Sequence, residues 1–325
     1  MANNLSYTFA VARIRALESA LFNSSVIEQL IACKSEEACM QVLAEKGWGD
    51  VDTPASDSEA VLKAEEEKAW EVMRQLGVDL KVFDVLFYPH LFHNLKAAIK
   101  EVCTEDENPD IFYEDASIGG EQMVKIVKER NFAVLPPIMA KAAEEAYDTL
   151  LHTRDGQLCD IIIDRATLDA IYETGKNSDE DIIRDYAESI VAVTDIKIAI
   201  RCARIGKPLD FVQRALAKCT SLSADELARA AINGEEAVRS YLMNTAYAGA
   251  AAALEESLSS FERWCDNRII YTIKPQQYAS FSVGPLVAYV LARVNEIKTV
   301  RIILSGKANG LSEESIRERV REMYV

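Results

Sequence analysis

One short pattern occurs three times in this chain at an even interval. Each copy is an apolar helical segment with a lysine, and a second cation follows three or four places later. The lysines are Lys96, Lys197 and Lys298, and 101 residues separate each from the next. Because repeated units bury their apolar faces against one another, the interval predicts an all-α chain of three pseudo-repeats of about 100 residues, arranged with pseudo-threefold symmetry.

The third copy lies in the clearest predicted helix. Its apolar residues recur at steps of three and four, which is typical of an amphipathic helix: Leu286, Val290, Val294, Ile297, Val300 and Leu304. Gly306 is predicted to end this helix, and Gly206 to end the second copy, which spans about 181–205. Nearly all other segments have helical spacing. Residues 268–273 could form either a strand or a buried helix end.

The repeat boundaries follow from the loops between the predicted helices. The stretch 104–120 combines several acids with a proline and two glycines, which indicates a loop between units. A second break is predicted at Gly206-Lys207-Pro208, since proline cannot continue a helix. We therefore divide the chain into helical repeats of 1–104, 105–207 and 208–325.

Composition excludes several classes of partner. The chain carries 36 Lys and Arg against 52 Asp and Glu, a net charge of −16, so nucleic acid and bare anionic lipid are not expected as main partners. Seven scattered cysteines without a C-x-x-C pair predict reduced thiols in a cytosolic protein. No signal peptide and no apolar run of about eighteen residues is found, so no membrane span is expected.

The sequence lacks the motifs of common catalytic and cofactor sites. The Gly-Lys pairs at Gly175, Gly206 and Gly306 have neither the preceding glycine nor the following Ser or Thr of a phosphate-binding loop. His90 and His93 could form a metal site with Cys103, but structural zinc normally needs four ligands. We interpret the histidines as a surface or hydrogen-bonded pair, and no metal, cofactor or catalytic residue is predicted.

The stronger signal is a set of basic stripes. Lys197, Arg201 and Arg204 follow helical steps on one face, with Asp195 as the local acid. Equivalent cations follow in the other copies. One interpretation is a surface for an acidic or polar partner, and the other is structural pairing with acids on neighbouring helices. The candidate partner-binding residues are Lys96, Lys100, Lys197, Arg201, Arg204, Lys298 and Arg301.

Several of these segments resemble one known family. They are Tyr7 with 13–18 (Arg-Ile-Arg-Ala-Leu-Glu), 94–96 (Asn-Leu-Lys), 295–298 (Asn-Glu-Ile-Lys), 301–303 (Arg-Ile-Ile) and the pair Gly306-Lys307. Together they resemble the C subunit of bacterial and archaeal V/A-type rotary ATPases, the counterpart of the d subunit of eukaryotic V-ATPases. The resemblance covers essentially the whole chain. Val294 and Thr299 depart from the expected Glu and Asn, which leaves subtype and contacts open.

The resemblance implies a function without chemistry in this chain. It implies a funnel-shaped, non-catalytic socket whose wide face sits on the cytoplasmic side of the membrane rotor ring. The cavity would hold the tip of the central stalk. Such a chain would be cytoplasmic, attached to the membrane through the ATPase complex, and monomeric when isolated. Whether the complex pumps protons or sodium, and whether it makes or hydrolyses ATP, is set by its other components.

Two other classes remain open at this point. A helical-repeat scaffold or adaptor would also have repeats and an acidic surface, but it would be elongated rather than closed. A helical enzyme would need a pocket with convergent titratable groups, for which the two histidines are the best candidates.

Overall fold

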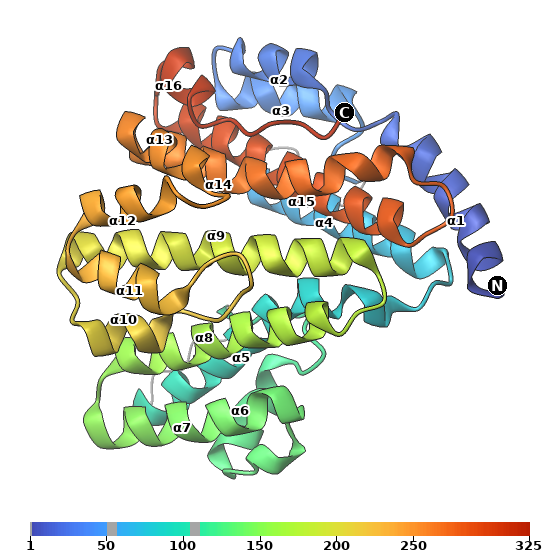
Figure 1. Cartoon of the computed structure of the whole chain (residues 1–325). Helices are drawn as coiled ribbons and strands as arrows, with labels where there is room; N and C mark the ends of the chain where they lie inside the picture. The colour runs from blue at the N-terminus through green and yellow to red at the C-terminus, as the bar shows by residue number, and fades with distance from the viewer. Residues whose placement is uncertain (1, 51–56, 105–110) are drawn as a thin grey trace. The chain divides into compact units, whose positions relative to one another are not determined.

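Every secondary-structure element in the described part of the chain is a helix. The computed structural model describes residues 2–50, 57–104 and 111–325, with side chains from residue 7 onward (Figure 1). Within these ranges no helix combines the length and apolar character needed to cross a membrane. The predicted all-α fold is therefore confirmed. The chain forms two compact units, which we call unit 1 (1–80, 180–182 and 249–325) and unit 2 (81–179 and 183–248).

Unit 1 is built around the helix α15 (Gly284–Ala308). This helix contacts six other α-helices of the unit, which are α1 (Ala2–Glu18), α2 (Ser24–Ile31), α3 (Glu36–Glu45), α4 (Ser58–Gln75), α14 (Leu258–Ile273) and α16 (Glu313–Arg317). The core between them includes Leu30, Leu43, Leu62, Val300 and Ile316. Helix α13 (Ala248–Glu256) and the 3-10 helix η4 (Lys274–Tyr278) complete the unit.

The prediction that α15 is amphipathic holds only for its second half. Every residue from Gly284 to Arg293 is buried, so this half of the helix is enclosed on all sides. Between Arg293 and the last turn of the helix, the exposed residues are Val294, Lys298, Arg301 and Ser305. A helix that is enclosed on all sides is a central element of a core rather than a surface helix.

Gly306 does not end α15, which corrects a second prediction. The helix continues through it to Ala308, and Gly310 adopts the left-handed conformation (φ +67°) beyond the end. Gly306 is instead a close-packing position, because a Cβ there would lie 2.7 Å from Cγ1 of Ile316. Gly206 does end its helix as predicted, with φ +66° and a hydrogen bond from the Lys207 N–H to the Cys202 carbonyl.

Residues 268–273 form the last turns of α14, so the helical alternative is confirmed for this segment. Ile270 and Ile273 are buried, as expected for a helix end packed against the core. A run of six residues is too short for periodicity to separate a strand from a helix, and packing against α15 decides here.

Unit 2 contains a four-helix core. Helices α5 (Asp84–Thr104), α6 (Gly120–Lys128), α7 (Pro137–Thr153) and α8 (Gly156–Lys176) enclose Phe92, Leu95, Met139, Ala146 and Ile163. Pro137 occupies the first turn of α7, where its missing N–H costs no hydrogen bond. Two 3-10 helices, η1 (Leu80–Phe83) and η3 (Phe132–Val134), precede α5 and α7.

A second part of unit 2 packs along α8. Helix α9 (Asp181–Ile205) has the bounds predicted for the second copy of the pattern, and its Ala187 and Val191 pack on Leu168 and Ile171 of α8. The approach is close, because a Cβ on Gly175 would lie 2.2 Å from Cβ of Ala187. Helices α10 (Leu209–Ala215), α11 (Ala224–Ile232) and α12 (Glu235–Leu242) follow.

The three predicted repeats do not coincide with the two compact units. Helices α5 and α9 lie in unit 2 except for the first two residues of α9, and α15 lies in unit 1. The boundary predicted at residue 105 lies outside the described residues, which omit 105–110. The division into 1–104, 105–207 and 208–325 therefore stays a prediction.

Candidate partner-binding surface

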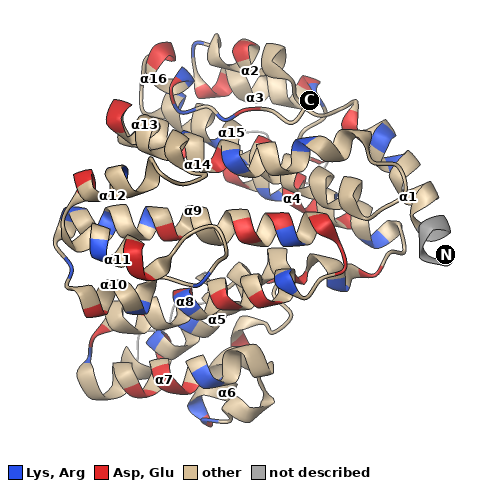
Figure 2. Cartoon of the chain, in the orientation of Figure 1, with Lys and Arg blue, Asp and Glu red and all other residues tan. Residues whose placement is uncertain are grey.

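The seven basic candidates lie on the three helices that carry the repeated pattern. Lys96 and Lys100 lie on α5, and Lys298 and Arg301 on α15, while α9 carries Lys197, Arg201 and Arg204. Figure 2 marks the charged residues along the ribbon. Most of these cations have a carboxylate partner on a neighbouring helix.

On α5 the two lysines pair with α8. The Lys96 ammonium lies 2.6 Å from the Asp164 carboxylate, and the Lys100 ammonium lies 2.6 Å from that of Asp160. The two acids are four residues apart on α8, as the two lysines are on α5, so the two ion pairs lie one helical turn apart between these helices. All four side chains are partly exposed, and such pairs contribute only about 0–1 kcal/mol each.

On α9 the three cations differ from one another. The guanidinium of Arg204 donates to Glu235 of α12 at 2.5 Å, and this hydrogen bond raises the pKa of Arg204 further. Lys197 is half-buried. Arg201 is exposed, and it makes no ion pair with any residue in the described ranges. Arg201 is therefore the candidate most available to a partner.

On α15 the two cations also reach neighbouring helices. The Lys298 ammonium lies 2.6 Å from Asp266 of α14, and the Arg301 guanidinium lies 3.1 Å from Glu59 of α4. The Asp266 carboxylate also lies 2.8 Å from the Arg321 guanidinium. Five of the seven candidates thus have a carboxylate of this chain beside them, and charge pairing rather than a bare positive stripe describes the free chain.

A buried ionic cluster in unit 1 was missed by sequence reasoning. Arg293 of α15 donates to Glu296 at 2.6 Å and to Glu65 of α4 at 2.5 Å, and Lys68 also binds Glu65. The guanidinium of Arg293 lies over the ring of Trp48, 5.2 Å from its centroid. Charged residues interrupting the apolar run 283–304 were a signal that could have indicated this cluster.

The repeated pattern has a second regular spacing that sequence reasoning did not use. Asn94, Asp195 and Glu296 are also separated by 101 residues, each two places before the repeated lysine. All three are buried, and each accepts a hydrogen bond from the backbone N–H of a distant segment. The donors are Tyr113 at 2.8 Å, Ala217 at 3.0 Å and Phe22 at 3.1 Å, respectively.

These buried polar residues fix loops to the three helices. Because a buried polar side chain without a partner is costly, each acceptor holds one segment in place against its helix. Burial raises the pKa of Asp195 to about 7 and that of Glu296 to about 7. Asp195 was expected to offset the basic stripe of α9, but its side chain is 1% exposed and bonded inward.

The histidines are used in local contacts. His90 pairs with Asp115 at 2.8 Å and stacks on Tyr113, while His93 donates from Nε2 to the Ile111 carbonyl at 2.9 Å. Across the described ranges, no three His, Cys, Asp or Glu side chains are grouped so that they could hold a metal ion.

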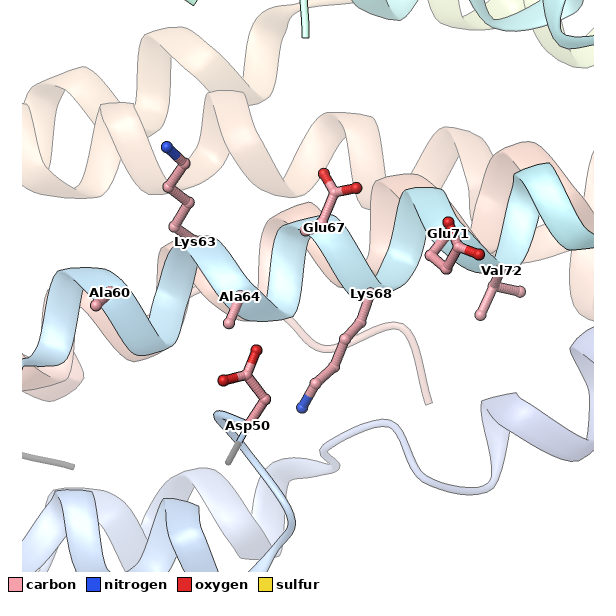
Figure 3. Close-up of a pocket in the computed structure, with 8 residues that line it drawn as sticks. All are labelled: Asp50, Ala60, Lys63, Ala64, Glu67, Lys68, Glu71 and Val72. Carbon is pink, nitrogen blue, oxygen red and sulfur yellow. The ribbon is translucent and has the colours of Figure 1, made fainter. Parts of the chain in front are cut away.

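An open pocket of about 690 Å³ runs along α4 in unit 1 (Figure 3). Ala60, Ala64 and Val72 contribute its apolar surface, and charged side chains surround them. Glu71 accepts hydrogen bonds from Gln75 and Arg74, which lower its pKa and keep it ionised near neutral pH. The pocket therefore offers alternating, paired charges rather than an acid and a base poised for proton transfer.

Comparison with known proteins gives a consistent result. The family model described as ATP synthase (C/AC39) subunit matches residues 10–319. The chain belongs to this family. It is 22% identical over 318 residues to the C subunit of the V-type sodium ATPase of Enterococcus hirae, covering 96% of this chain and 97% of that protein.

Two archaeal members of the family are also similar. The C subunit of the A-type ATP synthase of Methanocaldococcus jannaschii is 25% identical over 343 residues, covering 96% of this chain and 85% of that protein. The C subunit of the Haloferax volcanii A-type ATP synthase is 31% identical over 140 residues, covering 41% of this chain and 40% of that protein. The resemblance to the C subunit of V/A-type ATPases is thus confirmed.

Proposed function

We propose that this AC39-family chain is a non-catalytic coupling subunit of a V/A-type ATPase or ATP synthase. It would act as a rotor socket that joins the central stalk to the membrane rotor ring, so that ATP hydrolysis or synthesis is coupled to ion transport. The observation that carries the proposal is the family match over residues 10–319, with relatives named as C subunits that match along nearly their whole length. The chain would be cytoplasmic, peripheral to the membrane, and monomeric when isolated.

The interior of unit 1 is suited to transmitting torque. A coupling part must be stiff, because any twist within it delays rotation of the next part. Helix α15 is enclosed by six helices, and the Arg293 cluster adds charge-assisted hydrogen bonds between α15 and α4. Close-packed cores have low compressibility, so force applied to one side of the unit reaches the other.

The equivalent roles of Asn94, Asp195 and Glu296 support the proposal of three related repeats. Three acceptors at one interval, each holding a distant N–H, are what repeated supersecondary units would produce. We propose that the three repeats, 1–104, 105–207 and 208–325, surround a common axis as a funnel.

For the stalk-facing surface we propose the seven basic residues, with Arg201 foremost. The ion pairs that Lys96, Lys100, Lys298 and Arg301 make within the chain are partly exposed, so they contribute little to its stability. A carboxylate of the stalk can therefore replace an intramolecular partner at small cost. Arg201 needs no such exchange within the described part of the chain.

Co-purification with the central-stalk proteins and the detergent-solubilised rotor ring tests the proposal. The wild-type chain is expected to hold both at once at low salt, and moderate salt should weaken only the stalk contact. Binding to neither partner would refute the coupling role. Charge reversal by Arg201→Glu with Lys298→Glu should reduce stalk binding at least about tenfold while the ring stays bound.

A matched control is available in unit 2. Lys128 of α6 is exposed and makes no ion pair with a described residue, so Lys128→Glu changes net charge by the same amount per site. Equal losses for this control and for Arg201→Glu would show a general charge effect and would remove the basic set from the stalk interface.

A further inference from the structure

The last turn of α14 and the segment that joins it to α15 display aromatic side chains to solvent. We call residues 271–283 the aromatic connection. Tyr278 is 87% exposed, Phe281 61% and Tyr271 50%, which is unusual for side chains of this size. Aromatic residues are enriched in interaction surfaces relative to the rest of a protein surface, so a group of exposed aromatic residues indicates such a surface.

Other parts of unit 1 hold the aromatic connection in one conformation. Arg15 of α1 donates to the carbonyls of Gln276 and Ala279, both at 2.6 Å. The side chain of Gln277 donates to the Tyr324 carbonyl near the C-terminus. Ile273 and Val283 are buried at its two ends. The backbone is thus ordered before any partner binds, which lowers the entropic cost of association.

The charge of this region is distinct from that of the rest of the chain. Acids make up 52 of the 325 residues, yet none occurs in residues 267–295, the longest such run in the sequence. Residues 2–17 of α1 also contain no acid, and in this helix Arg15 binds the aromatic connection and Phe9 is exposed. Tertiary structure brings the two runs together (Figure 1). Glu322, paired with Lys274 at 3.5 Å, borders the region.

The position of this surface separates it from the basic candidates on α15. The aromatic connection leads into the start of α15 at Gly284, whereas Lys298 and Arg301 lie in its second half. At a rise of 1.5 Å per residue, the two surfaces are roughly 20–25 Å apart along one enclosed helix. A single stiff element therefore links the basic candidates Lys298 and Arg301 to the aromatic connection.

We propose that the aromatic connection is the surface of this chain that binds the membrane rotor ring. The inference rests on the proposed coupling function, which requires two partners on one stiff body. A ring lies among lipid headgroups whose anionic members repel a chain of net charge −16. A surface to which its own segments contribute no acids approaches them with less repulsion, and Tyr and Phe are suited to the membrane interface and to the pockets of a partner.

The test combines binding with cross-linking on the full-length chain. Tyr278→Ala with Phe281→Ala should weaken binding to the detergent-solubilised ring at least about 30-fold and leave stalk binding unchanged. Val134→Ala with Met243→Ala, which removes two exposed apolar side chains of unit 2, is the control and should leave ring binding unchanged. Circular dichroism and thermal melting confirm folding of each variant.

Cross-linking identifies the partner directly. A photoreactive benzoylphenylalanine in place of Tyr278 should cross-link to a protein of the ring in the assembled complex. Cross-links to the stalk or to a second copy of this chain would overturn the inference. So would Tyr278-dependent cosedimentation with phosphatidylglycerol vesicles that contain no ring, because lipid alone would then be the partner.

The two levels of the proposal fail in different ways. If the wild-type chain binds stalk and ring and the aromatic variant still binds the ring, only the assignment of this surface is wrong. If the wild-type chain binds no ring, the coupling function and the surface assignment are both refuted.

Discussion

The substitution Asp195→Asn tests how burial sets the electrostatics of the repeated helices. Asp195 of α9 accepts the Ala217 N–H at 3.0 Å, and it is 1% exposed. An amide oxygen can accept the same hydrogen bond, as Asn94 does at the equivalent position of α5. The change therefore removes a buried ionisable group while keeping the acceptor.

The magnitude follows from the raised pKa. Burial raises the pKa of Asp195 from 3.8 to about 7, with Arg165 acting to lower it and Asp169 to raise it. Since the folded state binds the proton more tightly, the stability due to this group is complete below pH 3.8 and is lost as pH rises through 7. At about 1.4 kcal/mol per pKa unit, the wild type loses about 2–3 kcal/mol more than Asp195→Asn between pH 5 and pH 8.

The assay is urea unfolding of both proteins at pH 5, 6, 7 and 8. The free energy of unfolding of Asp195→Asn relative to wild type should rise with pH, whatever constant cost the amide group adds. Asp148→Asn, which removes a charge from an exposed position in α7, controls for the change in net charge. Parallel pH dependences for wild type and Asp195→Asn would refute the claim that Asp195 is a buried carboxylate with a raised pKa.

Two further predictions concern the core of unit 1. Gly306→Ala should lower the free energy of unfolding by about 1–3 kcal/mol, because the new Cβ would lie 2.7 Å from Ile316. Thermal melting measures this loss. An unchanged melting temperature would show that Ile316 can move away. Arg293→Met should cost about 3–5 kcal/mol at pH 8 by leaving the carboxylates of Glu65 and Glu296 without it. The loss should shrink below pH 6 as Glu296 takes up a proton, and chemical denaturation at both pH values would reveal a pH-independent loss if this account is wrong.

The candidate site shows what local sequence cannot specify. The repeated pattern placed seven cations on three equivalent helices, and all seven lie on α5, α9 and α15. It left open whether they face a partner or pair within the chain, because the acids that meet them come from distant segments. Glu59 is 242 residues from Arg301, and Asp164 is 68 residues from Lys96.

Local sequence signals were sufficient to predict the helical class and the bounds of α9. Periodicity and a glycine–proline stop are local signals, and a helix closes its own backbone hydrogen bonds within four residues. The repeated interval of 101 residues was also visible, although only the lysines were used and not Asn94, Asp195 and Glu296 two places earlier.

Which helix faces are buried depends on contacts between distant segments and could not be predicted from local sequence. Helix α15 has an amphipathic pattern in part of its length, yet neighbouring helices enclose its first half, and Gly306 serves packing against Ile316 rather than ending the helix. Tertiary structure also brings Arg293, Glu65 and Glu296 into one cluster, and it joins two acid-free segments through residues 261 positions apart. Burial depends on which surfaces meet after folding, and that information is shared among segments far apart in the chain.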